Sequence, residues 1–388
     1  MKYNFDRIIK RENTNSVKYD LRKEYFGKPD ILPLWVADMD FATPDFIRNA
    51  VIERAKHPVY GYTVRKEEFP NSIISWMKRR HNWEVNKDWI SFSPGIVPAL
   101  NMCVLAYSEP GDKIMIQPPV YFPFFRAVKD HNRDLLENVL VNTNNNYSID
   151  FEDFEEKAKE AKIFILCHPH NPVGRLWNHE ELRKMVEICV KNNVIIFSDE
   201  IHSDLILRNN KHIPVLTIPG AEKITVSMYA PSKTFNLAGL SSSYLIIPDK
   251  KLKLNYDRLI DNLHMGLGNV FGAVALEAAY NEGEEWLEEL LIYIQDNISF
   301  LDNYLKERIP LVKSIIPEAT YLVWLDFREL GMEDEELKKF IIHEAKIGLN
   351  HGPVFGSGGE GFQRINVACP RKILKKALNQ LENAIKNR

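Results

Sequence analysis

The stretch KIFILCHPHNPVGRLWNHEELRKMVEICVKNNVIIFSDE, residues 162–200, has two short apolar runs on either side of an amphipathic segment. The runs KIFILC and VIIFS have the length and residue types of buried strands. The segment HEELRKMVEICVKNN between them has the apolar spacing of a helix. Strand, helix and strand in this order predict a unit of a mostly parallel sheet.

The same alternation extends along the chain in both directions. The flanking runs are WISFS followed by PALNMCVLAYS, then KIMIQ, and later ITVSMY and SYLIIP. Strands that alternate with helices indicate an α/β layer structure, and ligands of open sheets of this kind bind at the carboxyl ends of the strands. We therefore expect functional residues directly after each apolar run.

Composition narrows the classes of partner. The 388 residues are 45% hydrophobic, enough for a sizeable core over two or three domains' length, and the net charge is −3 with both signs interleaved. This balance predicts neither nucleic-acid nor membrane binding and favours small molecules or other subunits as partners. No apolar signal core or membrane-length run is present, and four scattered cysteines do not form a disulfide framework, so we expect a cytoplasmic protein.

A turn into a helix follows the run ISFS. In the sequence PGIVPAL, the amides of Gly95, Ile96 and Val97 can point outward at a positive helix end and form a phosphate cradle. A plain strand-to-helix connection explains the same residues, so this signal needs support from others.

The sequence HPHNPVGR, residues 168–175, follows KIFILC. Cys167, His168 and His170 offer no tetrahedral ligand set and no second cluster at ligand spacing, so no metal is expected. Asn171 can donate its amide to a ligand oxygen, although an Asn-Pro turn with a local cap is an alternative.

A carboxylate and a lysine follow the next two strands. Asp199 emerges beside a buried layer, where a carboxylate needs a cation or several donors to stay ionised, although it could also cap a turn. Lys233 follows the run ITVSMY. A phosphate cradle, an oxygen-directed Asn, a carboxylate and a lysine together describe a receptor for pyridoxal phosphate, which carries a phosphate, a ring oxygen, a pyridinium nitrogen and an aldehyde.

At these residues the chain resembles pyridoxal-phosphate enzymes of the aspartate aminotransferase fold (fold type I). Within them it is most similar to the carbon–sulfur β-lyases of the cystathionine β-lyase type, the MalY/PatB group. The resemblance runs over nearly the whole chain. Its motifs are LPLWVADMDF, YGYT, SPGIVPA, QPPVYFPF, HPHNPVGR, SDEIHSDL, APSKTFNLAGL, EATYLVWLDFR and FQRINVACPR.

The resemblance implies a role for each matching residue. Lys233 is the Schiff-base lysine and the general base, Asp199 the pyridinium partner, and Tyr121 the aromatic group over the ring; these three form the catalytic set. Asn171 donates to the ring oxygen and borders the substrate, whose carboxylate Arg364 grips. The phosphate contacts come from Ile96 and Val97 amides, from Ser232 and from Tyr62 of the neighbouring subunit. Without the resemblance, Tyr121 would be taken for a core residue and Arg364 for a surface arginine.

Two positions depart from the general aminotransferase pattern. His202 stands where a tyrosine commonly donates to the ring oxygen, and Ser241 stands where an arginine often pairs with the phosphate. Both departures fit the β-lyase subgroup. His202 either orients the ring, as part of the cofactor site, or only packs against it.

The resemblance also implies the architecture and the reaction. We expect a large cofactor-binding domain, residues 47–287, with a mixed seven-stranded sheet, and a small α+β domain from residues 1–46 and 288–388, in a homodimer with sites between subunits. The expected reaction is β-elimination from S-substituted L-cysteines to pyruvate, ammonia and a thiol. An aminotransferase on the same scaffold and a regulatory protein that retains the cofactor are the alternatives.

Overall fold

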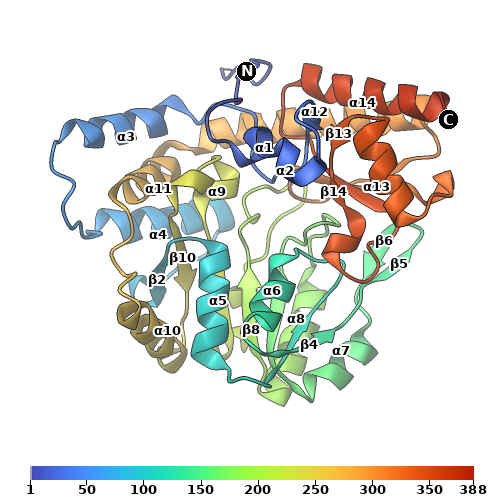
Figure 1. Ribbon diagram of the computed structural model, residues 1–388. Helices are drawn as coiled ribbons and strands as arrows, with labels where there is room; N and C mark the ends of the chain where they lie inside the picture. Colours follow the sequence, from blue (N-terminus) through green and yellow to red (C-terminus); the bar gives the residue numbers. More distant parts are fainter. Residues whose placement is uncertain (1) are drawn as a thin grey trace.

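The computed structural model describes residues 2–388 and is built around a seven-stranded sheet (Figure 1). Its strand order is β2-β10-β9-β8-β7-β3-β4. The strands are β2 (Ile90–Ser93), β3 (Lys113–Ile116), β4 (Asp134–Glu137), β7 (Ala161–Cys167), β8 (Ile195–Asp199), β9 (Thr225–Tyr229) and β10 (Ser243–Ile246). Only β10 runs against its neighbours, so the sheet is mostly parallel, as the alternating runs predict, and mixed, as the resemblance implies.

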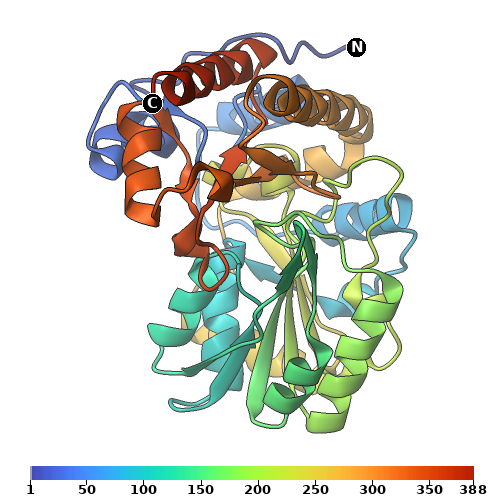
Figure 2. The same ribbon diagram turned by 90° about the vertical axis from the view of Figure 1, so that its right-hand side faces the viewer.

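Helices cover both faces of this sheet, and Figure 2 shows it between them. One face packs against α5 (Ile96–Tyr107), α6 (Pro123–Lys129) and α10 (Lys250–Asn262), the other against α7 (Phe151–Ala158) and α8 (His179–Asn192). Helix α8 begins with a capping box, in which Asn178 and Glu181 satisfy each other's backbone amides, and ends at Asn193 in the left-handed conformation. The expected helix between the two quoted strands is therefore confirmed almost to the residue.

The register of the central strands sets which side chains share a face. Cys167 on β7 pairs with Asp199 on β8, and Asp199 pairs with Met228 on β9. Because side chains alternate along a strand, these three point to the face that carries α5. The carboxyl ends of β7, β8 and β9 thus meet at one edge of the sheet.

A smaller sheet is formed by the C-terminal part of the chain. Its order is β11-β12-β15-β14, and all its pairs are antiparallel. These strands are β11 (Lys313–Ile315), β12 (Leu322–Asp326), β14 (Asn350–His351) and β15 (Phe362–Asn366). The helices α12 (Glu284–Arg308), α13 (Asp334–His343) and α14 (Arg371–Lys386) lie beside it, at the top of Figure 1.

The N-terminal segment joins this C-terminal part. Strand β1 (Leu32–Pro33) pairs in parallel with β13 (Ile347–Gly348). The remaining elements are α1 (Val17–Asp20), α2 (Arg22–Phe26), α3 (Asp45–Lys56), α4 (Glu68–His81), β5 (Val141–Thr143), β6 (Asn146–Ser148), α9 (Pro231–Thr234), α11 (Val270–Glu282) and short 3-10 helices at 87–89, 215–217, 221–223, 238–240, 328–330 and 352–355.

A single large apolar cluster connects both halves of the chain. It contains buried residues of α4, α11, α12, β12 and α14, so the two sheets share packed side chains. The division into residues 47–287 and the two terminal segments stays a proposal. Among residues 2–388, no helix combines the length and the apolar content needed to cross a bilayer.

Candidate active site

A cavity of about 280 Å³ lies at the carboxyl ends of β7, β8 and β9, where the strand pattern predicts a ligand site. The structure brings together there, as lining residues, eight of the residues predicted for the site: Ile96, Val97, Tyr121, Asn171, Asp199, His202, Ser232 and Lys233. Ala37, Cys167, Ser241 and Ser242 also line this cavity, which we call the central cavity.

The N-terminus of α5 forms one end of the central cavity. Helix α5 begins at Ile96, so the first amides of the helix have no partner within it, and they attract an anion together with the helix dipole. A Cβ on Gly95 would lie 3.2 Å from Cδ of Pro98, and glycine avoids this crowding. The hydroxyl of Ser242 is buried and lacks a hydrogen-bond partner among the described residues, so it is available to a phosphate oxygen.

Lys233 projects into the central cavity from the short helix α9. The Lys233 side chain is half-buried: part of it faces the open cavity, and the rest is surrounded by protein. Burial lowers its pKa from 10.5 to about 8, with a smaller lowering by Arg364, while Asp38 and Asp199 act in the opposite direction. Its Nζ donates to the carbonyl oxygen of Ala37 at 2.7 Å. A lysine with this pKa can give up its proton near neutral pH.

Asp199 is the last residue of β8 and is 5% exposed. Burial raises the pKa of its carboxyl to about 7, although the amide of Ile201 donates to Oδ1 at 3.2 Å and Lys233 favours the ionised form. A cation placed beside this carboxylate would restore its charge. This matches the expectation that Asp199 needs a cationic partner.

Asn171 and Arg364 are in direct contact. Arg364 lies on β15, is 2% exposed, and donates from Nη1 to Oδ1 of Asn171 at 2.9 Å. Its Nη2 donates to Oδ1 of Asn350 at 2.6 Å and to the carbonyl oxygen of Trp35 at 3.1 Å. Its Nε has no partner among residues 2–388, so one buried donor is free for a ligand. Arg364 is therefore an interior residue, as the resemblance implies, and not a surface arginine.

The turn that carries Asn171 is held tightly. The amide of Gly174 donates to the carbonyl oxygen of His170 at 2.8 Å, and Gly174 has a φ of 74°. A Cβ at this position would lie 2.4 Å from Cβ of Pro317, so both the conformation and the space require glycine. The turn thereby points Asn171 at the central cavity.

Tyr121 and His202 complete the wall around Lys233. Burial raises the pKa of Tyr121 to about 12, with a further increase from Asp199, so its hydroxyl stays protonated. Burial, Lys233 and Arg364 together lower the pKa of His202 to about 3, so its imidazole is neutral. Nδ1 of His202 is buried and unpartnered within the described chain. A neutral imidazole with a free nitrogen can orient a ligand but carries no charge.

Tyr62 is the one predicted cofactor residue outside this group. Its side chain is 99% exposed, and it does not line the central cavity of its own chain. It lies in an apolar stretch with Val59, Tyr60 and Val64, whose side chains are 61%, 57% and 68% exposed. An exposed apolar stretch of this kind is typical of a surface that another molecule covers.

The histidines of HPHNPVGR serve the fold. Nε2 of His168 contacts the carbonyl oxygen of Ile213 at 3.1 Å, and Nε2 of His170 contacts that of Pro119 at 3.0 Å. Burial lowers the pKa of His168 to about 3 and that of His170 to about 4, so both rings are neutral. No group of three or more His, Cys, Asp or Glu within residues 2–388 is arranged to hold a metal ion.

Sequence reasoning missed the N-terminal segment Trp35–Met39. The carbonyl oxygen of Ala37 accepts bonds from Lys233 and, at 3.0 Å, from the hydroxyl of Tyr321. The carbonyl oxygen of Trp35 accepts from Arg364. The acceptors in these hydrogen bonds are main-chain carbonyl oxygens, so no pattern of side chains in the sequence could have indicated the contacts. Only the motif LPLWVADMDF, read as a resemblance, drew attention to this segment.

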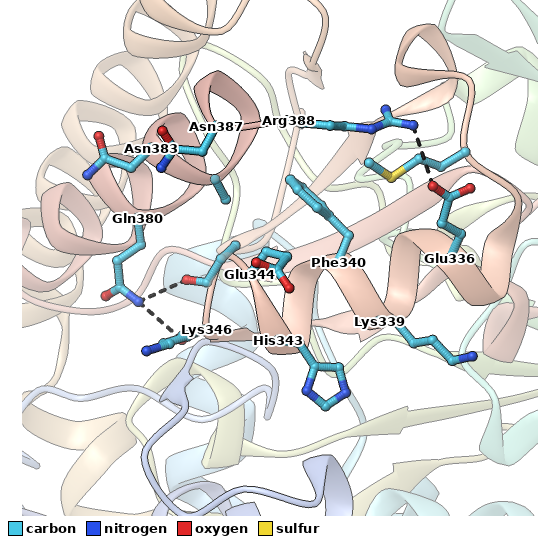
Figure 3. A pocket seen from close by; sticks show the side chains of 13 residues that line it. Glu336, Lys339, Phe340, His343, Glu344, Lys346, Gln380, Asn383, Asn387 and Arg388 are labelled. Carbon is cyan, nitrogen blue, oxygen red and sulfur yellow. Dashed lines mark hydrogen bonds and ion pairs between the residues drawn. The ribbon is translucent and has the colours of Figure 1, made fainter.

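A second and larger cavity, of about 740 Å³, lies between α13 and the end of α14 (Figure 3). Figure 3 shows Gln380 donating to the backbone carbonyls of Ala345 and Lys346, and Arg388 contacting Glu336. This larger cavity shares no lining residue with the central cavity. The chemistry predicted at the strand ends therefore belongs to the smaller cavity.

Comparison with known proteins agrees with this geometry. The aminotransferase class I and II family matches residues 29–381. The chain is 43% identical to the cystathionine β-lyase PatB of Bacillus subtilis over 98% of this chain and 100% of the relative. It superposes on cystalysin of Treponema denticola, which contains pyridoxal 5'-phosphate, with a TM-score of 0.97 and 35% identity over 100% of both chains. The pyridoxal-phosphate-bound C–S lyase of Staphylococcus hominis gives 0.93 and 35% over 98% of both. The chain thus belongs to the aminotransferase class I and II family, which confirms the predicted fold and the lyase-like resemblance.

Proposed function

We propose that this protein is a pyridoxal-phosphate-dependent carbon–sulfur β-lyase that converts an S-substituted L-cysteine and one water molecule into pyruvate, ammonia and a thiol. One observation carries the proposal. A lysine with a lowered pKa, a buried carboxyl and a helix N-terminus line the central cavity, and a buried arginine contacts Asn171 in its wall. The chain that holds this arrangement is 43% identical to a cystathionine β-lyase.

The residues present fit pyridoxal phosphate at each end of the molecule. The α5 amides and the unpartnered hydroxyl of Ser242 suit the phosphate, while Asp199 would face the ring nitrogen and Asn171 the ring oxygen. When bound, the cofactor condenses its aldehyde with an amine and withdraws electrons from the substrate's Cα. Because burial raises the pKa of Asp199, a protonated ring nitrogen beside this carboxyl would favour its ionised form.

Arg364 and Lys233 divide the work on the substrate. Arg364 would bind the substrate carboxylate with its free Nε and with a terminal nitrogen that now contacts Asn171 or Asn350. This fixes the substrate's Cα near Lys233, whose Nζ removes the Cα proton as general base. The lowered pKa of Lys233 keeps a useful fraction of neutral amine near pH 7 to 8.

The C–S bond breaks after the proton is removed. A thiolate can leave from Cβ because thiols have a pKa of about 8.5. Tyr121 would cover one face of the ring, and its protonated hydroxyl lies in the same cavity wall as Asn171. His202, which is neutral, would support the ring side without adding charge.

A homodimer is part of the proposal. The exposed apolar stretch 59–64 supports a second copy of this chain as the covering surface, with Tyr62 reaching the partner's phosphate site. A cytoplasmic location is also proposed. It is supported by four cysteines that are all buried and unpaired, as in proteins of reducing compartments.

Aminotransferase activity is the second candidate, because both reactions begin with the same proton removal and the family includes aminotransferases. The deciding experiment measures pyruvate and free thiol from an S-substituted cysteine without any keto acid. We expect both products in equal amounts, and at most a slow, single turnover with alanine. Turnover that requires 2-oxoglutarate and releases no thiol would establish the aminotransferase instead.

A further inference from the structure

We propose that Asp204 is a positioning residue, which holds the short helix α9 through Thr234 and thereby fixes the amine of Lys233 for attachment to the cofactor aldehyde. This inference rests on the proposed role of Lys233. Asp204 is 3% exposed and does not line the central cavity. It therefore acts on the amine only through other residues.

Helix α9 needs support from the rest of the protein. It has only four residues, and a single turn of helix is not stable on its own. Its N-cap residue, Ala230, provides no side-chain cap. Lys233 and Thr234 are consecutive, and consecutive residues of a helix point about 100° apart. Lys233 lines the central cavity, whereas Thr234 is fully buried and does not line it. An anchor on Thr234 can therefore orient α9 without blocking the amine.

The carboxylate of Asp204 links α9 to helix α4. Its Oδ2 accepts from the hydroxyl of Thr234 at 2.9 Å, and its Oδ1 contacts Nε1 of Trp76 at 3.1 Å and Nε2 of His81 at 3.0 Å. Burial raises the pKa of this carboxyl, but the contacts with His81, Arg80 and Thr234 outweigh burial and lower the pKa below its ordinary value. An ionised carboxylate only accepts, so it holds all three donors in one arrangement.

The segment that carries Asp204 also carries two residues of the central cavity. Asp199 and His202 line this cavity, and the amide of Leu205 donates to the carbonyl oxygen of His202 at 2.9 Å. The bond from Asp204 to α9 therefore connects two separate parts of the cofactor site. One part provides the carboxyl for the ring nitrogen, and the other provides the amine of Lys233.

Asp204 acts on Lys233 by position and not by charge. Burial is the main cause of the lowered pKa of Lys233, and the charged groups that also act on it are Asp38, Arg364 and Asp199. Asp204 is not one of these groups. Loss of the contact with Asp204 should therefore change where the amine lies, and not how readily it loses its proton. These two effects can be measured separately.

The first test removes the hydroxyl of Thr234. Thr234→Val keeps the shape of the side chain and deletes its bond to Asp204. We expect the plateau rate at which the apoprotein attaches pyridoxal phosphate to fall about tenfold or more, because a misplaced amine reaches the aldehyde less often. The pH midpoint of this rate should stay at about 8. Stopped-flow absorbance over pH 6 to 11 measures both values, and an unchanged plateau rate would overturn the inference.

Two further variants control for the loss of a hydroxyl and of packing. Thr234→Ser retains the hydroxyl, so its plateau rate should lie within about twofold of wild type. Thr225→Val is the matched control, because Thr225 is equally buried at the start of β9 and its hydroxyl has no partner among the described residues. This control should leave the plateau rate unchanged. Thr234→Ala takes the place of Thr234→Val if the latter does not fold. A serine variant as slow as the valine variant would contradict the inference.

Pyridoxine 5'-phosphate distinguishes a misplaced amine from a loosened site. This compound has the ring and phosphate of the cofactor but an alcohol in place of the aldehyde, so it binds without reacting with Lys233. Its Kd, measured by calorimetry, should be the same in wild type and Thr234→Val. A Kd that rises as much as the rate falls, or a pH midpoint that moves toward the value of about 10.4 for lysine in water, would overturn the inference.

The wild-type protein tests the proposed function separately. If it attaches pyridoxal phosphate at Lys233 but forms no pyruvate from S-methyl-L-cysteine, the β-lyase function fails and the positioning role of Asp204 stands. If it forms pyruvate, and Thr234→Val attaches the cofactor as fast as wild type, the positioning role fails and the function stands. Attachment at a different lysine would overturn both.

Discussion

Lys233 Nζ donates a 2.7 Å hydrogen bond to the carbonyl oxygen of Ala37, a residue 196 positions earlier in the chain. The hydroxyl of Tyr321, from the C-terminal part, donates to the same oxygen at 3.0 Å. Three distant segments therefore fix the position of the reactive amine. Holding the amine without a directly contacting carboxylate keeps its pKa low, since an ion pair would raise it.

We predict that Lys233→Ala folds but loses both the covalent attachment of the cofactor and turnover, by at least about 10³-fold. Borohydride reduction followed by peptide mapping of the wild type should place the cofactor on the peptide that contains Lys233. Lys223→Ala, at an exposed lysine on the other side of β9 in the chain, serves as the control and keeps the label. A label on another lysine would refute the assignment.

The lowered pKa of Lys233 predicts how the apoprotein regains its cofactor. Only the neutral amine attacks an aldehyde, so the rate of reconstitution with pyridoxal phosphate should rise with pH through about 8 and then level off. A lysine in water would show this rise near 10.4. Stopped-flow absorbance over pH 6 to 11 measures the midpoint, and a midpoint near 10 would show that burial does not tune the amine.

Arg364 is predicted to bind the substrate carboxylate through the geometry of its several N–H donors as well as through its positive charge. Arg364→Lys keeps the positive charge but has only three donors on one nitrogen, too few to keep both asparagine contacts and to bind a carboxylate through two hydrogen bonds, so KM should rise about 10- to 100-fold. The resting absorbance of the cofactor should stay unchanged. Arg328→Lys, at an arginine that pairs with Asp326 in the same part of the chain, is the control. A changed resting spectrum in Arg364→Lys would place this residue beside the cofactor itself.

The parts of the site that follow strands could be predicted from the sequence. Asn171, Asp199 and Lys233 each come directly after an apolar run, and parallel strand order brings these ends together. The three side chains also differ in chemistry, because one is an amide, one a carboxyl and one an amine. Local pattern and strand topology were therefore enough to place the central cavity.

The remaining contacts depend on long-range packing and on the main chain. Trp35 and Ala37 act through carbonyl oxygens, which every residue possesses, and Arg364 lies on a strand whose burial only the folded chain reveals. Tyr121 and Arg364 were placed by family resemblance alone.

Tyr62 is predicted to serve the partner subunit, because its side chain is 99% exposed and does not line the central cavity of its own chain. Tyr62→Ala and Lys233→Ala should each be inactive alone. Mixed dimers should recover activity at one of two sites, up to about a quarter of wild type in a statistical mixture, as in any two-fold assembly with shared sites. Subunit exchange must be shown by mass spectrometry. No recovery after exchange would place both residues in one chain's site.

The raised pKa of Asp199 predicts a conflict between cofactor binding and stability. The folded apoprotein holds the Asp199 proton up to about pH 7, whereas the unfolded chain releases it near 3.8. Ionisation of this carboxyl therefore lowers the free energy of unfolding as the pH rises between these values, and the loss is complete above about pH 7. Asp199→Asn keeps the shape and carries no charge. At 1.36 kcal/mol for each pKa unit, the apo variant should be more stable than the apo wild type by about 2 to 4 kcal/mol at pH 8.

This difference has a defined pH dependence and reverses with cofactor. The advantage of apo Asp199→Asn should shrink as pH falls toward 5, because the wild-type carboxyl is then protonated in the folded state. With pyridoxal phosphate bound, the order should invert, since a neutral amide cannot pair with the protonated ring nitrogen. Urea unfolding at pH 5 and pH 8, with and without cofactor, measures the difference in unfolding free energy between variant and wild type under each of these four conditions. A variant that is less stable than wild type in the apo form at pH 8 would show that Asp199 is charged and already satisfied without the cofactor.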